Sequence, residues 1–274
     1  MGQFERIRYP DGQISAKCLE KPPFFPETIS ERINSYEDLF YIRSIADCVS
    51  DPSKLDLFIP CMFGQRSDRR FSKMQSFDLK LICDIINECG FGKVEIFDPH
   101  SDVTMALIDK SIKKTSFVYV AQAVGDIRDR ILRDDPHSGG GDLLLVSPDA
   151  GAYKKVFEYG EQLNLPVMGA MKHRDKDGKI DLMFTHDVSG KDCLIVDDMC
   201  DGGYTFNVLS KELRKQGARK VYLYVSHGLF SKGFKELAEN IDHIYCTNSV
   251  KEISERELGR EHGVFDFVTQ YKVI

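Results

Sequence analysis

The sequence lacks the patterns that define several large protein classes. No apolar run approaches the roughly 20 residues of a membrane-spanning helix, and the first residues hold no apolar signal-peptide core. The formal net charge of -6 argues against a general nucleic-acid-binding protein, because such proteins usually carry a basic excess. No internal repeat or low-complexity tract is present. We therefore expect a cytoplasmic globular protein with neither a membrane nor a nucleic acid as partner.

Two further motifs are missing. Eight cysteines occur, but none form a Cys-x-x-Cys pair, and most lie in apolar segments. This is typical of reduced core residues, so a disulfide framework and a zinc site are both disfavoured. The Walker loop, Gly-x-x-x-x-Gly-Lys-Ser/Thr, is also absent. Any nucleotide must therefore be held by another kind of site.

Short apolar segments alternate with segments of helical periodicity along most of the chain. Strands are predicted at residues 55–61, 94–97, 117–121, 143–146, 167–171, 193–196, 221–225 and 243–246. The clearest helices are predicted at residues 35–49, 77–89, 125–133 and 206–213. Such alternation is typical of parallel sheets built from βαβ units. This alternation of strands and helices occurs twice along the chain, which predicts two α/β domains, residues 1–135 and 136–274.

The segment at residues 192–206 is the most informative. A predicted buried strand runs directly into Asp197 and Asp198, and Asp-Gly-Gly-Tyr-Thr at 201–205 then opens a predicted helix. Ligands of open α/β sheets bind beyond the carboxyl ends of the strands. Two carboxylates, a glycine pair and a hydroxyl at that point indicate a sugar-phosphate site.

Polar residues also follow three other predicted strands: His100, Asp149 and His227. If these strands are parallel, the polar groups gather at the same edges as the two aspartates. Carboxylates and histidine hold Mg²⁺ directly or through water. Each residue alone is equally well explained as a helix cap, but their joint occurrence favours a site.

Basic residues form two groups that suit phosphate. Arg66, Arg69 and Arg70 follow a predicted strand, where bidentate phosphate binding and solvated surface charge are equal alternatives. Lys172 and Arg174 begin a charged excursion suited to closing over a polyphosphate. An ordinary hairpin turn also explains that excursion.

Together these segments resemble the ribose-phosphate diphosphokinase (PRPP synthetase) family over about residues 5–250. The similar segments are the strand and loop at 59–68, the Asp-Pro-His at 98–100, VSPDAG at 146–151, Lys-His-Arg at 172–174, VDDM at 196–199 and SHGLFS at 226–231. The resemblance implies two phosphoribosyltransferase-like α/β domains with mostly parallel sheets. It implies a transferase that moves the β,γ-diphosphoryl group of ATP to the anomeric hydroxyl of a ribose 5-phosphate moiety and releases AMP.

The resemblance also implies a role for each segment. Asp197 and Asp198 would bind the ribose hydroxyls, and Lys172 and Arg174 would be catalytic. The 5-phosphate would be surrounded by Asp201, Gly202, Gly203, Tyr204 and Thr205. Mg²⁺, the one cofactor, would be held by His100 and Asp149. ATP would be bound by Arg66, Asp68, Tyr9, Asp11 and Gln13. In the family, the loop of the last three reaches a neighbouring subunit, so a homo-oligomer, dimer or hexamer, is implied.

The phosphate loop departs from the family pattern. Gly202 stands where the family has a threonine, Tyr204 adds an aromatic ring, and Ser67 replaces a glutamine. Gly202 leaves room for a phosphodiester, and Tyr204 suits stacking on a base beyond it. The acceptor is therefore either ribose 5-phosphate, giving PRPP, or ADP-ribose, giving ADP-ribose pyrophosphate. The second is the chemistry of short phage-encoded relatives that serve NAD resynthesis in the host cytoplasm.

Two alternatives remain open. A phosphoribosyltransferase shares the aspartate pair but needs neither the first α/β half nor the Lys-x-Arg loop. A non-catalytic PRPP-synthetase-associated regulatory protein is expected to lose catalytic charges, whereas Lys172, Arg174, His100 and Asp149 are all present. An enzyme is favoured over this regulatory homologue, which is the alternative from the class of binding proteins.

Overall fold

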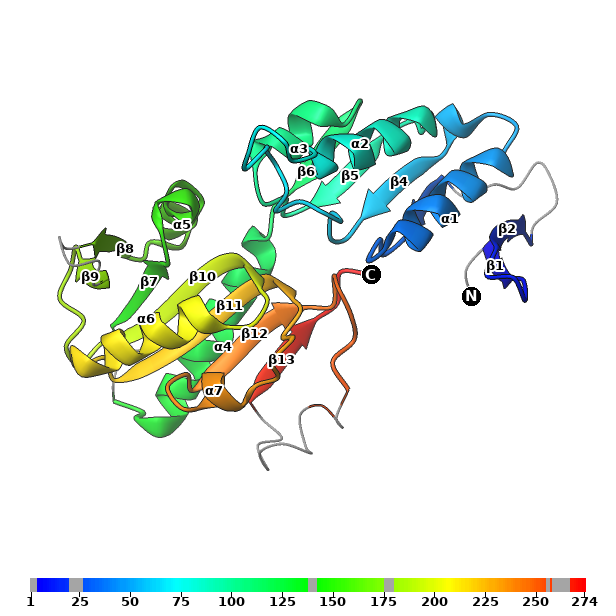
Figure 1. Ribbon diagram of the computed structural model, residues 1–274. Coiled ribbons are helices and arrows are strands. Elements are labelled where there is room, and N and C mark those ends of the chain that lie inside the picture. The colour runs from blue at the N-terminus through cyan, green and yellow to red at the C-terminus, as the bar shows by residue number, and fades with distance from the viewer. Residues whose placement is uncertain (1–3, 20–26, 138–141, 175–179, 255–256, 258–266) are drawn as a thin grey trace. The chain divides into compact units, whose positions relative to one another are not determined.

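The chain folds as two compact α/β units, residues 1–115 with Ile274 and residues 116–273 (Figure 1). The computed structural model describes residues 4–19, 27–137, 142–174, 180–254, 257 and 267–274. Each unit is built on a sheet with mostly parallel strands, as predicted. Among the described residues, no helix is both long enough and apolar enough to cross a bilayer.

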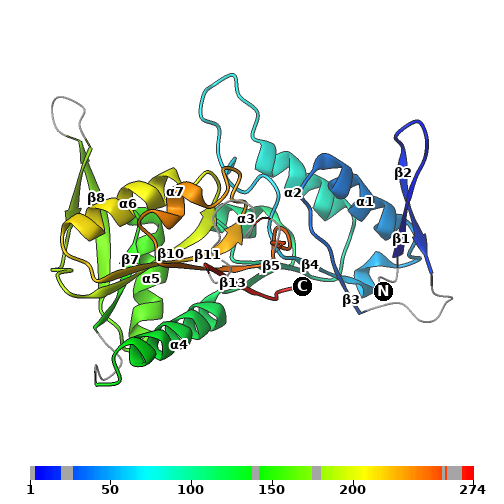
Figure 2. The ribbon, with the colours of Figure 1, turned by 90° about the horizontal axis from the view of Figure 1, so that it is seen from below.

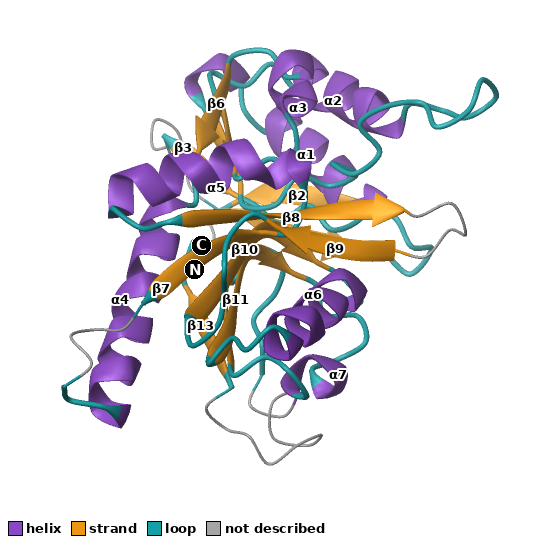
Figure 3. Cartoon of the chain, turned by 90° about the vertical axis from the view of Figure 1, so that its left-hand side faces the viewer, coloured by secondary structure: helices purple, strands orange, loops and turns teal. Residues whose placement is uncertain are grey.

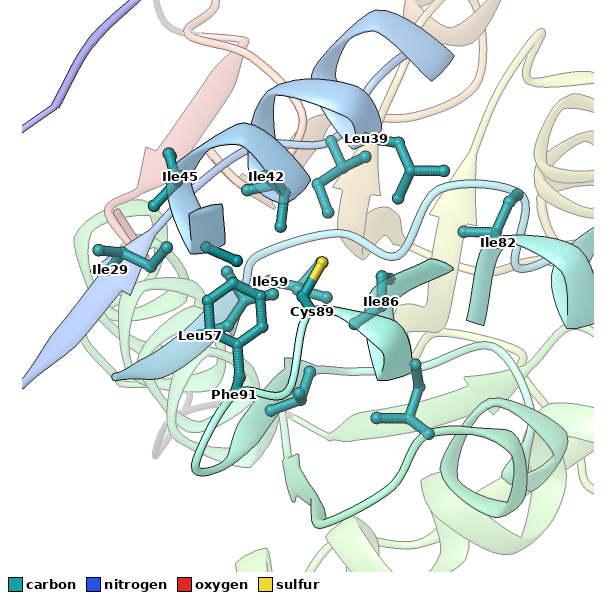
Figure 4. Close-up of a cluster of buried hydrophobic side chains, with 14 of the residues drawn as sticks. Ile29, Leu39, Ile42, Ile45, Leu57, Ile59, Ile82, Ile86, Cys89 and Phe91 are labelled. Atoms are coloured by element: carbon teal, nitrogen blue, oxygen red, sulfur yellow. The ribbon is translucent and has the colours of Figure 1, made fainter. Parts of the chain in front are cut away.

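The first unit contains a four-stranded parallel sheet in the order β3-β4-β5-β6. Its strands are β3 (Thr28–Ser30), β4 (Asp56–Ile59), β5 (Val94–Phe97) and β6 (Ser111–Lys114). The connecting helices are α1 (Tyr36–Asp47), the 3₁₀ turn η1 (Pro52–Lys54), α2 (Asp78–Glu88) and α3 (Asp102–Leu107). One apolar stripe of α1 and one of α2 pack on β4 to form a single core (Figure 4).

A hairpin precedes this sheet and packs against α1. Strands β1 (Phe4–Arg8) and β2 (Ile14–Cys18) pair antiparallel around the turn that the sequence predicts at residues 9–13. Arg6 bonds to Asp38 of α1 at 2.7 Å, and its guanidinium lies 4.1 Å from the ring centroid of Tyr41. These contacts hold the hairpin on the helix while its turn stays exposed.

The second unit contains a seven-stranded sheet in the order β13-β12-β11-β10-β7-β8-β9, parallel except for the β8–β9 hairpin at one edge (Figure 3). Its strands are β7 (Leu143–Ser147), β8 (Val167–Arg174), β9 (Ile180–Phe184), β10 (Asp192–Cys200), β11 (Lys220–Gly228), β12 (His243–Thr247) and β13 (Val268–Tyr271). Its helices are α4 (Phe117–Asp134), α5 (Ala150–Leu163), α6 (Tyr204–Lys215) and α7 (Lys235–Ala238).

Helices cover both faces of the second sheet. On β10, Cys193 and Ile195 pack with α6 and α7, whereas Leu194 and Val196 pack with α4 and α5 (Figure 2). Successive side chains of β10 point to opposite faces of the sheet, and both faces are covered by helices. Every residue at the centre of the strand is therefore buried, which explains its continuous apolar run. The mostly parallel sheet with its covering helices agrees with the α/β fold that the sequence pattern predicts.

One predicted strand is wrong. Residues 117–121 form the first turn of α4, because Val120, Val124, Ile127 and Ile131 recur at helical spacing and bury one stripe. That stripe packs with the second sheet. The division between the units therefore falls before α4, whereas the predicted domain boundary follows residue 135. The short strands β3, β6 and β13 were also not predicted.

The cysteines behave as predicted for reduced core residues. All eight are free, and six are buried. Desolvation raises the pKa of the thiols of Cys83, Cys193, Cys200 and Cys246 to about 12. These thiols are therefore neutral and poorly nucleophilic near neutral pH.

A partly buried ion pair supports the start of β10 and β11. The Asp192 side chain is fully buried, and Arg219 donates to its two oxygens at 2.9 and 2.6 Å.

We predict that Arg219→Ala lowers the free energy of unfolding by about 2–3 kcal/mol, because a buried carboxylate loses its partner. Urea denaturation followed by circular dichroism measures this. The control is Arg43→Ala, which removes an exposed pair with Glu88 and should cost below about 1 kcal/mol. Equal losses in both variants contradict the prediction.

Candidate active site

The predicted sugar-phosphate segment lies at the carboxyl end of the second sheet. Strand β10 pairs with β7 as far as Ile195 opposite Val146, and continues alongside β11 to Cys200. Asp197 and Asp198 therefore lie just beyond the last residues that pair with β7. Asp149 follows the end of β7 itself, so the prediction that these polar strand ends share an edge is confirmed for the three aspartates.

The two adjacent aspartates are held close to each other. Asp198 is 8% exposed, and its backbone N–H donates to Oδ1 of Asp197 at 2.9 Å. Desolvation and the neighbouring Asp198 charge raise the pKa of Asp197 well above its usual value, whereas Lys155 on α5 acts in the opposite direction. Adjacent carboxyl groups with little solvent access suit a ligand that donates hydrogen bonds, such as a sugar diol.

The loop after β10 ends in a helix with an open N-terminus. Gly203 is the N-cap of α6 and has φ 77°, and no side chain among the described residues caps the helix. A Cβ at Gly203 would lie 3.0 Å from Leu237. The positive φ and the lack of space for a side chain therefore both require glycine here. The first N–H groups of the 12-residue α6 therefore suit an anion.

The segment that follows β11 fixes this loop. Ser231 donates its hydroxyl to Oδ1 of Asp201 at 2.6 Å, and its N–H to the carbonyl of Asp201 at 3.2 Å. Phe230 and Leu229 both donate to the carbonyl of Cys200. The predicted substrate-binding residues Asp201 to Thr205 are thus brought together, with Tyr204 75% exposed at the start of α6.

Two of the other strand-end residues have clear structural roles. Asp149 caps α5, since its Oδ1 accepts from the N–H groups of Gly151 (2.9 Å) and Ala152 (3.1 Å). Capping by one oxygen still leaves Asp149 compatible with Mg²⁺, which takes few carboxylates together with phosphate oxygens and water. His227 is fully buried within the sheet, and its Nδ1 lies 2.9 Å from Oγ of Ser249.

The predicted catalytic residues lie on the edge hairpin. Lys172 pairs with Leu182 and Arg174 with Ile180, so both occupy alternate positions near the end of β8. Strands β8 and β9 pair antiparallel, but the Lys-Asp-Gly-Lys turn proposed as the alternative, residues 176–179, is not among the described residues. Residues 175–179, the remainder of the predicted charged excursion, lie outside the described residues.

The candidates of the first unit lie on the hairpin turn and on the loops that follow β4 and β5. Arg66 and His100 are exposed, and Asp68 is partly buried. Gln65, only 1% exposed, joins the two loops because its Oε1 accepts from the N–H of His100 at 3.0 Å.

On the hairpin, Tyr9 is 44% exposed, and its N–H donates to the carbonyl of Gln13 at 2.8 Å. Asp11 accepts from the N–H of Gln13 at 3.1 Å. The part of the chain that the structure describes contains no group of three or more His, Cys, Asp or Glu side chains that gathers as a metal site. Metal binding therefore stays a prediction for His100 and Asp149.

Comparison with known proteins gives the family. The model of the phosphoribosyl synthetase-associated domain matches residues 160–259. The sequence is 26% identical to the ribose-phosphate pyrophosphokinase of Agrobacterium fabrum over 83% of this chain and 75% of the relative. It is 30% identical to that of Cereibacter sphaeroides over 71% of this chain and 57% of the relative. The chain is thus similar to ribose-phosphate pyrophosphokinases over most of its length.

The fold agrees with this assignment. Phosphoribosylpyrophosphate synthetase from Mycobacterium smegmatis matches with a TM-score of 0.79 at 20% identity, over 98% of this chain and 86% of that one. The predicted family and α/β fold are confirmed, and the curated relatives are named as enzymes. The chain is thus an enzyme similar to ribose-phosphate pyrophosphokinases.

Four residues that act on predicted site residues were not singled out from the sequence: Gln65 in the first unit, and Lys155, Ser231 and Lys232 in the second. Three of them act on residues more than 25 positions away in the chain, and Lys155 acts on Asp197 from another element. Gln65 and Ser231 lie in two of the segments that resemble the family, at 59–68 and 226–231, but the resemblance implies no role for either. A local pattern carries no information on such contacts, so the fold was needed to find them.

The aspartate pair should reduce stability at neutral pH. Because the folded pKa of Asp197 is raised, the folded chain binds this proton more tightly than the unfolded chain. The contribution of Asp197 to stability is therefore most favourable below the ordinary aspartate pKa near 4 and falls as the pH rises through the folded pKa. We predict that Asp197→Asn stabilises the protein at pH 7 by about 1–2 kcal/mol, or about 3–6 °C in Tm, with no gain below about pH 4.

Thermal denaturation at both pH values measures this effect. The control is Asp187→Asn, which changes an exposed aspartate whose Oδ1 likewise accepts a backbone N–H, from Ser189 at 2.9 Å. That variant should shift Tm little at either pH. A lower Tm for Asp197→Asn at pH 7 would show that the charge of Asp197 stabilises the fold instead.

Proposed function

We propose that this chain transfers the β,γ-diphosphoryl group of ATP to the anomeric hydroxyl of a ribose 5-phosphate moiety and releases AMP. The observation that carries the proposal is the succession of an adjacent aspartate pair and an uncapped helix N-terminus at the end of β10. The carboxyl groups suit the ribose diol and the N–H groups suit its phosphate. One continuous segment thus matches both ends of a ribose 5-phosphate.

The remaining predicted residues would serve ATP. Lys172 and Arg174 would neutralise the charge that develops on the transferred group. Arg66 and Asp68 would bind the nucleotide, with the hairpin residues Tyr9, Asp11 and Gln13 acting on ATP in a homo-oligomer. His100 and Asp149 would hold Mg²⁺, which would offset the charge of the triphosphate oxygens.

The acceptor is either ribose 5-phosphate or ADP-ribose, the latter giving ADP-ribose pyrophosphate for NAD resynthesis. Two features favour the larger acceptor. Gly202 puts no side chain at the rim of the phosphate loop, and the exposed ring of Tyr204 lies at the start of α6. At residue 202 itself no side chain therefore obstructs a phosphodiester, and an aromatic face is available to a base.

The decisive experiment incubates the purified protein with Mg-ATP and either ribose 5-phosphate or ADP-ribose. Mass spectrometry should detect AMP together with the diphosphorylated sugar, and a chelator should abolish both. A phosphoribosyltransferase would need no ATP and would form no AMP. Equal AMP release without any acceptor would contradict the proposed transfer.

Lys172→Ala tests the catalytic assignment. We predict a loss of kcat of about 100-fold or more, because a preorganised charge that stabilises the transition state is removed. The matched control is Lys154→Ala, which removes an exposed lysine from α5 and should leave kcat unchanged. Steady-state AMP formation measures both variants. Full activity of Lys172→Ala would contradict the proposed catalytic role of Lys172.

A further inference from the structure

Lys232 lies across the phosphate loop at the position where that loop has no side chain. An ideal Cβ at Gly202 would contact Cδ and Cε of Lys232, each at 3.4 Å. The aliphatic stem of Lys232 therefore runs along Gly202, and its ammonium group, one bond beyond Cε, lies beside the rim of the loop. Ser231, the preceding residue, fixes this geometry by bonding to Asp201.

The charges around the loop make this lysine significant. Asp197, Asp198 and Asp201 place three carboxyl groups within five residues, and a bound phosphate would add more negative charge. The N-terminus of α6 supplies only about half a positive charge. Lys232 is exposed and forms no ion pair with another described residue. Its ammonium group is therefore available to a ligand.

We infer that Lys232 is a specificity-determining residue that binds a second phosphate attached to the 5-phosphate of the acceptor. This inference rests on the proposed function. The N–H groups of α6 suit one phosphate, and a diphosphate needs a further cation near the point where it leaves the loop. A flexible lysine stem delivers such a charge. Gly202 and Lys232 act together, because the branched side chain of a threonine at 202 would occupy space beside the stem.

Direct binding tests this without turnover. Isothermal titration calorimetry, without ATP, compares ADP-ribose and ribose 5-phosphate on the full chain and on Lys232→Met, which keeps the apolar stem and removes the charge. We expect the Kd for ADP-ribose to rise about 5- to 10-fold and that for ribose 5-phosphate to rise less than about 2-fold. The difference should shrink when the salt concentration is raised from about 0.05 to 0.5 M.

Two further variants sharpen the test. Lys235→Met removes an exposed lysine three residues away and should leave both Kd values unchanged. Gly202→Thr should weaken ADP-ribose binding in the same direction as Lys232→Met, because the added atoms displace the lysine stem. Circular dichroism confirms that each variant is folded.

The outcomes separate this inference from the proposed function. An equal loss for both ligands, or no loss for either, overturns the assignment of Lys232 to a second phosphate. If the unmodified enzyme still forms AMP with an acceptor, the proposed function survives that result. If the unmodified protein binds neither ligand, both the inference and the acceptor site are wrong.

Discussion

The pairing of β10 with a parallel neighbour on each side is the constraint on which the candidate site depends. Strand β7 pairs with its first four residues and β11 with nearly its whole length, and apolar side chains anchor it on both faces. A strand held this way has no freedom to slip, because a one-residue shift would place each core side chain on the wrong face. The residues at its end, Asp197 and Asp198, are therefore fixed by the core.

That constraint has an energetic cost at the end of the strand. The carboxyl groups of Asp197 and Asp198 lie side by side with little access to water, and the pKa of Asp197 is raised in consequence. Lys155 offsets only part of this. Such perturbed groups are common at functional sites, where a ligand supplies the missing hydrogen bonds. A ribose diol is suited to that role, so binding and relief of the unfavourable desolvation would occur together.

Much of this architecture was predictable from sequence because its signals are local. The apolar run before Asp197 predicts a buried strand, and the glycines before Tyr204 predict a turn into a helix; both are observed. Prediction failed where local signals conflict or are weak. Residues 117–121 contain β-branched and aromatic side chains, yet the helical stripe of α4 extends through them. Strand β6 is four residues long and mostly exposed, so it has no clear pattern.

The contacts that position the loops of the candidate site could not be predicted, for a different reason. Gln65 meets His100 and Ser231 meets Asp201 only because separate strands end at the same edge of a sheet. Neither glutamine nor serine has a pattern that identifies its partner. The same holds for Lys232 beside Gly202. Such contacts follow from topology, and topology becomes known only when the fold does.

Different parts of the candidate site would bind different parts of the substrate, and this limits which residues can change specificity. The ribose would be bound by side chains on a strand that the core fixes, and the phosphate by backbone N–H groups that Gly203 positions. Changing either would disturb the fold. Gly202 and Lys232, by contrast, lie at the rim and contribute little to the core. Under the proposed function, substitutions there would alter what the enzyme accepts beyond the 5-phosphate, while the reacting end of the sugar would be held in the same place.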